Sequence, residues 1–181
     1  GHIAEVGFDL YVRLVGEAVS EFRGEGTPER EVKIELPIEA HLPHDYVPSE
    51  RLRLEMYKHL ADVRTTDEVE ELRAELVDRY GEPPAAVETL LEVARLRVRI
   101  REAGLREVTT AGSNVRFAGA VLPESSQLRL RRIYPKSIYK HAAEIALVPH
   151  PRTVPVGGTP LRDRELLEWT RTVVDTLVPP A

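Results

Sequence analysis

Residues 85–117 read AAVETLLEVARLRVRIREAGLREVTTAGSNVRF, and the spacing of their apolar residues changes part-way along. Over 85–103 the apolar residues recur every three or four positions on two faces, which predicts a helix buried on two sides. Gly104 suits the left-handed backbone that commonly follows a helix. Apolar and polar residues then alternate, which predicts strands over 105–110 and 114–117 joined by a tight turn. This stretch therefore predicts helices combined with antiparallel strands.

Three further elements are predicted on the N-terminal side. Strict alternation over 31–36 predicts a half-buried strand. Ser49 is a natural N-cap for a helix that continues to about residue 63. Thr65 and Glu68 have the spacing of a capping box, which predicts the start of another helix that ends at Tyr80, before a Gly and two Pro residues.

On the C-terminal side, alternating patterns predict strands over 128–134 and 144–148, and a 3.6-residue period predicts a last helix over 162–177. The chain opens with a helical pattern over 3–22 that lacks a capping residue and has apolar residues on two sides, as a helix cut from a preceding domain would. The predicted class is α/β, of the α+β type: helices packed on a small, mostly antiparallel sheet.

Composition limits the classes of function. With 42% hydrophobic and 30% charged residues in 181, the chain has the balance of a globular protein. It has no cysteine, which excludes disulfides and thiolate metal sites and favours a cytoplasmic location, and no apolar run long enough to span a membrane. The net charge of −5 is uneven: 14 basic against 23 acidic residues over 1–103 give −9, and 11 against 7 over 104–181 give +4.

Few residues suggest catalysis. His41, His44 and Asp45 offer two imidazoles and a carboxylate in a proline-containing loop, either as a weak zinc-site candidate or as ordinary loop residues. Gly157 and Gly158 form a glycine pair without the lysine of a phosphate-binding loop, so a turn is predicted there. No nucleophile motif is present, and we predict neither an enzyme nor a bound cofactor.

Two charged stripes are candidate binding surfaces. The acidic stripe lies on the helix that ends at Tyr80 and is either a docking surface or a solvated helix face. The basic stripe lies on the strand predicted over 128–134 and is either a nucleic-acid contact, with interleaved rings for base stacking, or an edge strand protected by charge. The acidic stripe comprises Glu68, Glu71, Glu75 and Asp78; the basic stripe comprises Arg129, Arg131 and Arg132, followed by Tyr134, Lys136, Tyr139 and Lys140.

Several strings resemble the C-terminal end of the bacterial transcription-repair coupling factors (Mfd). They are GFDLY at 7–11, RL at 51–52 with YK at 57–58, ELVDRYGEPP at 75–84 and ARL at 94–96, of which the third is the most specific. The resemblance covers residues 1 to about 108 well and is faint over 109–160.

This resemblance implies a division of the chain and a role. Residues 1–24 would be a helical segment from the end of the translocase motor region, and 25–181 a non-catalytic C-terminal regulatory domain. In the family this domain folds back on a UvrB-like N-terminal module and masks the surface that recruits UvrA, so it acts as an autoinhibitory clamp. Glu75 and Asp78 would face that module. ATP, Mg, DNA and RNA polymerase would engage other domains of the full-length protein.

Overall fold

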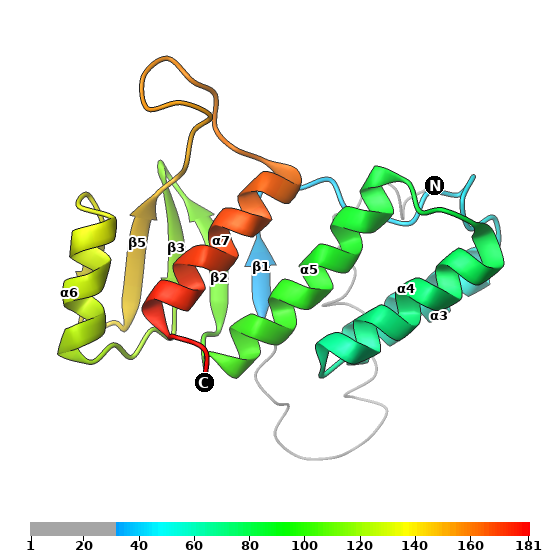
Figure 1. Cartoon of the computed structure of the whole chain (residues 1–181), viewed down its shortest axis with the longest axis horizontal. Helices are drawn as coiled ribbons and strands as arrows, with labels where there is room; N and C mark the ends of the chain where they lie inside the picture. The colour runs from blue at the N-terminus through cyan, green and yellow to red at the C-terminus, as the bar shows by residue number, and fades with distance from the viewer. Residues whose placement is uncertain (1–31) are drawn as a thin grey trace. The chain divides into compact units, whose positions relative to one another are not determined.

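The structure, a computed structural model, describes residues 32–181 (Figure 1). These residues divide into two compact units, one formed by Glu39–Val98 and the other by Val32–Ile38 together with Arg99–Ala181. The helix predicted over 3–22 and the domain boundary predicted after residue 24 lie outside the described residues.

The first unit is helical and has the predicted elements. It contains α3 (Glu50–Asp62), α4 (Thr66–Tyr80) and most of α5 (Ala85–Glu102), whose last turn belongs to the second unit. Both predicted N-caps are confirmed: the Ser49 hydroxyl accepts from the Leu52 N–H at 3.3 Å, and the Thr65 hydroxyl accepts from the Glu68 N–H at 3.2 Å. The apolar stripes of the three helices form the core of this unit, which includes Met56, Tyr57, Leu60, Val69, Leu76, Leu90 and Leu91.

The second unit is a five-stranded sheet with two helices. The strand order is β1-β2-β3-β5-β4; β1 and β2 are parallel and every other pair is antiparallel. The predicted fold class, helices with a small and mostly antiparallel sheet, is confirmed. The elements are β1 (Lys33–Glu35), β2 (Glu107–Ala111), β3 (Asn114–Ala118), α6 (Glu124–Ile133), β4 (Ile138–Lys140), β5 (Ile145–Pro149) and α7 (Asp163–Leu177).

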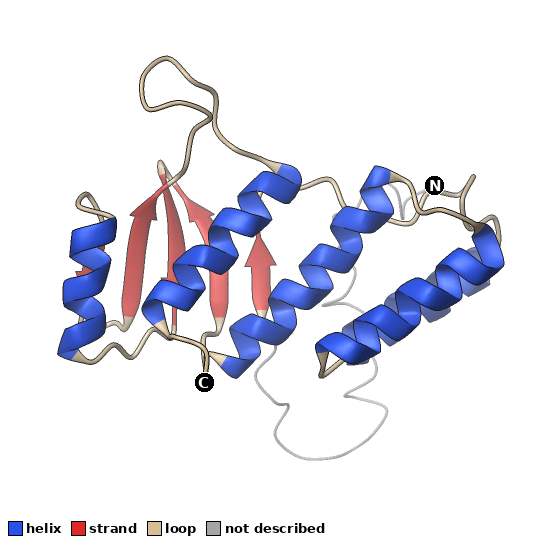
Figure 2. Cartoon of the chain, viewed as in Figure 1, coloured by secondary structure: helices blue, strands red, loops and turns tan. Residues whose placement is uncertain are grey.

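Helices α6 and α7 lie on the same side of this sheet, in front of the strands in Figure 2. The Trp169 ring of α7 packs against Phe117 of β3, with centroids 6.5 Å apart, and against Tyr134 at the end of α6, at 6.3 Å. Alternate residues of the strands point to this side and are buried, as the period of two requires. They are Ile34, Val108, Val115, Phe117, Ala146 and Val148.

The strand predicted over 128–134 is wrong, because these residues form the second half of α6 and the turn after it. Leucines alternate with arginines here, a pattern that also fits the two-residue period of a strand. The burial follows the helical period instead: Ser126 and Leu130, four apart, are buried, whereas Leu128 is 56% exposed. Leucine and arginine are both good helix formers, so local propensity also favours the helix. The edge strand beside β5 is β4, which was not predicted.

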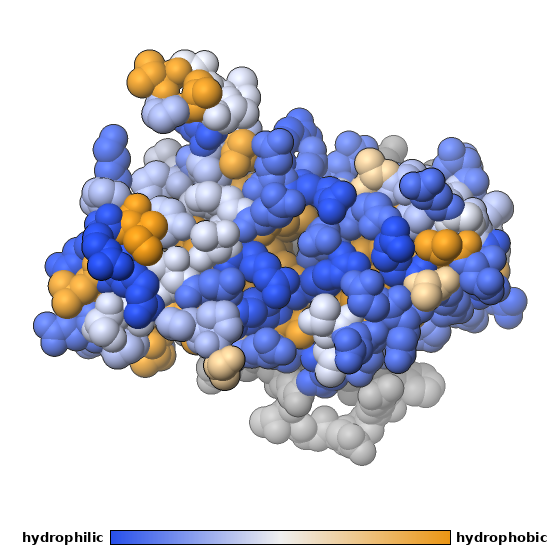
Figure 3. Space-filling view, in the orientation of Figure 1, coloured by the Kyte–Doolittle hydropathy of each residue, from blue (hydrophilic) through white to orange (hydrophobic). Residues whose placement is uncertain are grey.

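The loop between β5 and α7 closes on itself. The Thr153 N–H donates to the Thr159 carbonyl at 2.9 Å, and Gly157 has a φ of +77° at the turn, where the glycine pair predicted one. The loop exposes Val154 and Val156, and Figure 3 shows apolar surface on the loop at the top of the view.

Candidate functional site

The predicted acidic stripe lies on α4, which is firmly anchored within the first unit. Val69 and Leu76 are fully buried on its inner side. At its C-terminal end the Tyr80 ring packs against the Tyr46 ring, with centroids 5.6 Å apart, and the Tyr46 hydroxyl donates to the Gly81 carbonyl at 2.8 Å. Burial, followed by the nearby Glu88 carboxylate, raises the pKa of the Tyr46 phenol, so this hydroxyl stays protonated at neutral pH.

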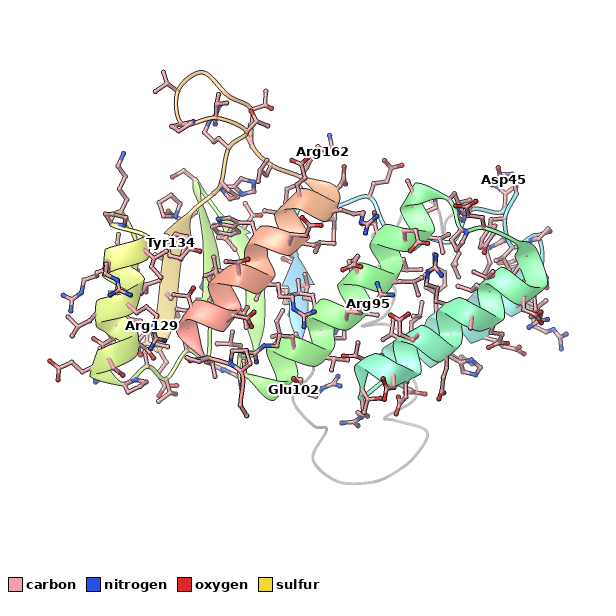
Figure 4. The ribbon with its side chains drawn as sticks, in the orientation of Figure 1. Asp45, Arg95, Glu102, Arg129, Tyr134 and Arg162 are labelled. Atoms are coloured by element: carbon pink, nitrogen blue, oxygen red, sulfur yellow. The ribbon has the colours of Figure 1, made fainter. Side chains whose placement is uncertain are left out.

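Ion pairs with α5 hold one flank of α4. The Arg73 guanidinium contacts the Glu88 carboxylate at 2.7 Å, and the hydrogen bond between them raises the pKa of Arg73. Arg95, in Figure 4, contacts Glu70 of α4 and Glu92 of α5, each at 2.6 Å. Because these carboxylates already have cationic partners within the unit, they contribute little to any surface offered to another molecule.

Only half of the predicted stripe is free for a partner. The Glu68 carboxylate accepts the Arg64 N–H at 2.9 Å at the start of the helix, and Glu75 is half-buried and pairs with Arg79 at 3.3 Å. Glu71 and Asp78 are exposed, and no ion pair to either occurs within residues 32–181. Glu68 and Glu75 therefore have partners within the unit, whereas Glu71 and Asp78 face solvent.

The centre of the exposed side differs slightly from the predicted stripe. Asp67, Glu71, Ala74 and Asp78 follow one another at spacings of four, three and four, and all are exposed. We call these four residues the α4 outer face. Sequence reasoning missed Asp67 and Ala74, although both could have been found by taking the residues half a helical turn away from the buried positions. Val77, 38% exposed, borders this face.

The α4 outer face carries three carboxylates that have no ion pair within residues 32–181, and a small residue lies at its middle. Carboxylates on an exposed helix accept hydrogen bonds from arginine or lysine, and arginine can bind one through two parallel N–H groups. Ala74 leaves room for a long cationic side chain to lie against the helix. The surface is therefore suited to docking a basic protein surface.

The candidate metal residues do not form a cluster. Among residues 32–181, no group of three or more histidine and carboxylate side chains is placed to hold a metal ion. His41 is half-buried and His44 is exposed. None of the helices within residues 32–181 is long and apolar enough to cross a membrane.

The basic stripe is not the strand face that was predicted. Arg129 points toward α7 (Figure 4), where its guanidinium donates to the Thr176 carbonyl at 3.1 Å, whereas Arg131 and Arg132 are exposed on α6. The two interleaved rings are also engaged. Tyr134 packs on Trp169, and burial raises the pKa of its phenol.

The Tyr139 hydroxyl donates to the Ala120 carbonyl at 2.7 Å and accepts from the Leu122 N–H at 3.2 Å. The prediction of a basic strand with free rings for base stacking is therefore wrong, because the arginines lie on a helix and both rings have partners within the unit.

Comparison with known proteins places the α4 outer face in a recognised domain. The family model of the TRCF domain matches residues 36–127, which is half of the chain and includes all of α4. The chain belongs to the TRCF domain family. This confirms the resemblance seen in the sequence.

Relatives of this TRCF-family chain extend the match. The transcription-repair-coupling factors of Mycobacterium bovis and Mycobacterium tuberculosis are each 42% identical to it over 190 residues, which cover 98% of the chain and 15% of the relative. That of Myxococcus xanthus is 37% identical over 152 residues, covering 82% of the chain and 13% of the relative. The chain thus spans about 15% of the length of the first of these relatives.

A solved structure shows the same fold. The crystal structure of a C-terminal domain of transcription-repair coupling factor superposes with a TM-score of 0.64 and 21% sequence identity, over 81% of this chain and 91% of the other. The TRCF fold therefore extends beyond the part matched by the family model, into the region where the sequence resemblance was faint.

Proposed function

We propose that this TRCF-family chain is a non-catalytic regulatory domain of a transcription-repair coupling factor, and that it acts as an autoinhibitory clamp. The α4 outer face docks on the UvrB-like N-terminal module of the same protein and masks the surface that recruits UvrA. The names of the relatives, each a transcription-repair-coupling factor, support a place in transcription-coupled DNA repair. The proposed location is the cytoplasm.

The observation that supports the proposal is that some carboxylates on α4 pair with cations within the unit and others do not. Glu70 and Glu75 have cationic partners within the unit, whereas Glu71 and Asp78 are exposed and have none among the described residues. The helix itself is fixed by its buried side and by the ion pairs of Glu70 and Arg73 with α5, so the exposed carboxylates are presented in a set geometry. Pre-organisation of this kind lowers the entropic cost of docking.

The clamp works by shifting a population between closed and open states. Within one polypeptide, tethering supplies an effective concentration on the order of millimolar, so a weak contact is enough to keep the clamp closed. Moving it from about 1:99 to 99:1 takes about 5.5 kcal/mol of differential binding. Engagement of RNA polymerase and DNA by other domains of the full-length protein, driven by ATP and Mg in its motor, is the proposed source of that free energy.

The test is charge reversal in the intact coupling factor, with UvrA association as the readout. Reversing Glu71 and Asp78 together (Glu71→Lys, Asp78→Lys) turns attraction into repulsion, and a coupling of about 1–3 kcal/mol corresponds to roughly 5- to 150-fold tighter UvrA association. Glu75→Lys has a smaller effect, because Glu75 is already paired with Arg79. The matched control is Glu55→Lys, an exposed carboxylate on α3. UvrA association that is the same in the double variant and the control refutes the clamp.

A further inference from the structure

The sheet of the second unit has a side that its helices leave open. Helices α6 and α7 pack on the side that carries Phe117 and Val148, and no helix among the described residues of this unit lies on the other side (Figure 2). Antiparallel sheets often expose one side, and that side is then usually polar. Here it is polar over β1 and β2 but apolar over β4 and β5.

The register of the strands brings the apolar residues together. Ile138 of β4 stands directly opposite Leu147 of β5, and Ile145 lies two residues from Leu147, so all three side chains point to the open side. Ile138 is 53% exposed, which is unusual for an isoleucine in a sheet, and Ile145 and Leu147 are half-buried. Lys140 stands opposite Ile145 and completes what we call the β4–β5 patch: Ile138, Lys140, Ile145 and Leu147.

Charges are balanced on one half of the open side and unbalanced on the other. Over β1, β2 and β3, Arg116 pairs with Glu107 at 2.7 Å and Lys33 pairs with Glu35 at 3.4 Å. Lys140, in contrast, is exposed and has no carboxylate partner in the described part of the chain. Arg129, Arg131 and Arg132 lie on α6, on the other side of the sheet, so Lys140 is the cation that the patch itself offers to a partner.

We propose that the β4–β5 patch docks an amphipathic helix of a partner protein, one with an aliphatic stripe bordered by carboxylates. The stripe covers Ile138, Ile145 and Leu147, and a carboxylate pairs with Lys140. A helix on this side completes a three-layer arrangement, with the sheet between two helical layers. The patch belongs to the second unit, and its role does not depend on docking by the α4 outer face.

Two other occupants fit the patch less well. A nucleic acid needs rings on which bases stack, but the exposed residues here are aliphatic, and Tyr139 alternates to the other side of β4, where its hydroxyl is bonded to Ala120. A second copy of the chain, joined patch to patch by a two-fold axis, brings Lys140 of each copy toward the other, and like charges oppose that pairing.

The experiment is a titration of the full chain, labelled at its isoleucine and leucine methyl groups, followed by NMR. The probe is a synthetic helical peptide with a leucine stripe flanked by glutamates, compared with the same peptide carrying lysines in place of the glutamates. We expect saturable shifts of the Ile138, Ile145 and Leu147 methyl signals with the acidic peptide only.

Two variants test the roles of the patch residues. Ile138→Asp should weaken binding at least tenfold, and Lys140→Glu should reverse the preference between the peptides. Val121→Asp, at a position 71% exposed outside the patch, is the matched control and should bind as the unchanged chain does.

Several results would overturn the proposal. One is the absence of a saturable shift at the three methyl groups, and another is an equal response to the acidic and basic peptides. A third is peptide-independent dimerisation that Ile138→Asp abolishes, which would assign the patch to a second copy. A fourth is binding of single-stranded DNA that Lys140→Glu abolishes, which would assign it to nucleic acid.

Discussion

Replacing Tyr46 with phenylalanine removes a single hydroxyl group, one that holds the C-terminal end of α4 in place. That hydroxyl donates to the Gly81 carbonyl at 2.8 Å and lies 3.3 Å from the Leu76 carbonyl, so it joins the loop before α3 to the C-terminal end of α4. The ring, and with it the contact to Tyr80, remains in the variant. Because a net intramolecular hydrogen bond contributes about 0.5–1.5 kcal/mol, Tyr46→Phe should lower the free energy of unfolding at neutral pH by about that amount.

The pH dependence of this difference follows from the raised pKa of Tyr46. In the unfolded chain the phenol has its ordinary pKa of 10.0, and in the folded chain burial and then the Glu88 carboxylate hold the pKa higher. The stability that depends on the protonated phenol is therefore fully present below pH 10 and is lost as the pH rises through the folded pKa. The difference between the unchanged chain and Tyr46→Phe should shrink over that range.

The assay uses urea unfolding with two signals, one for each unit. Far-UV circular dichroism is sensitive to the helical first unit, whereas the fluorescence of Trp169, the single tryptophan, reports on the second unit. Tyr46→Phe should shift the dichroism transition and leave the fluorescence transition in place. A difference in free energy that stays constant from pH 8 to pH 11, or a shift of the Trp169 transition of equal size, would show that the Tyr46 hydroxyl does not stabilise α4 in this way.

Two further predictions concern the second unit. Asp175→Ala should lower its free energy of unfolding by about 1.5–3 kcal/mol, measured by Trp169 fluorescence in urea, because Arg99, only 9% exposed in its side chain, loses the carboxylate that it contacts at 2.8 Å. Glu168→Ala, at an exposed position of the same helix, is the control, and an equal loss in both would contradict the prediction. Gly158→Ala should open the loop after β5 and speed its cleavage by protease, because a Cβ there would come within 2.6 Å of the Val154 backbone nitrogen. Val156→Ala, at an 89% exposed position, should be cleaved at the unchanged rate, and Gly158→Ala cleaved no faster than this control would contradict the account.

The helices of the first unit could be predicted from the sequence because their local signals agree. Ser49 and Thr65 mark the starts of α3 and α4, and Gly81 and Gly104, with φ of +85° and +77°, follow the ends of α4 and α5. The region after Ala120 was harder, because a leucine at every second position is compatible with a strand or with two sides of a helix. Packing decides in favour of the helix. Leu130 is buried, and Arg129 reaches the end of α7, 47 residues further along the chain.

Sequence spacing predicts a candidate site on α4, but it does not show which of the carboxylates have partners within the unit. Spacing alone placed Glu68 and Glu75 with Glu71 and Asp78, since all four lie away from the buried stripe. Which carboxylates are engaged depends on neighbours that spacing does not show: the Arg64 N–H at the helix start and the Arg79 side chain. The β4–β5 patch was not predicted, because it exists only through the register of two strands, one of which the sequence did not reveal.

The most direct test of the clamp is binding in trans. The purified chain is titrated with the separate UvrB-like N-terminal module of the coupling factor, and the dissociation constant is measured by calorimetry at low and at high salt. We expect saturable binding that weakens as salt increases, that is lost in the chain carrying Glu71→Lys and Asp78→Lys, and that is retained with Glu55→Lys. Absence of binding at low salt, or equal binding by the doubly reversed chain, would contradict it.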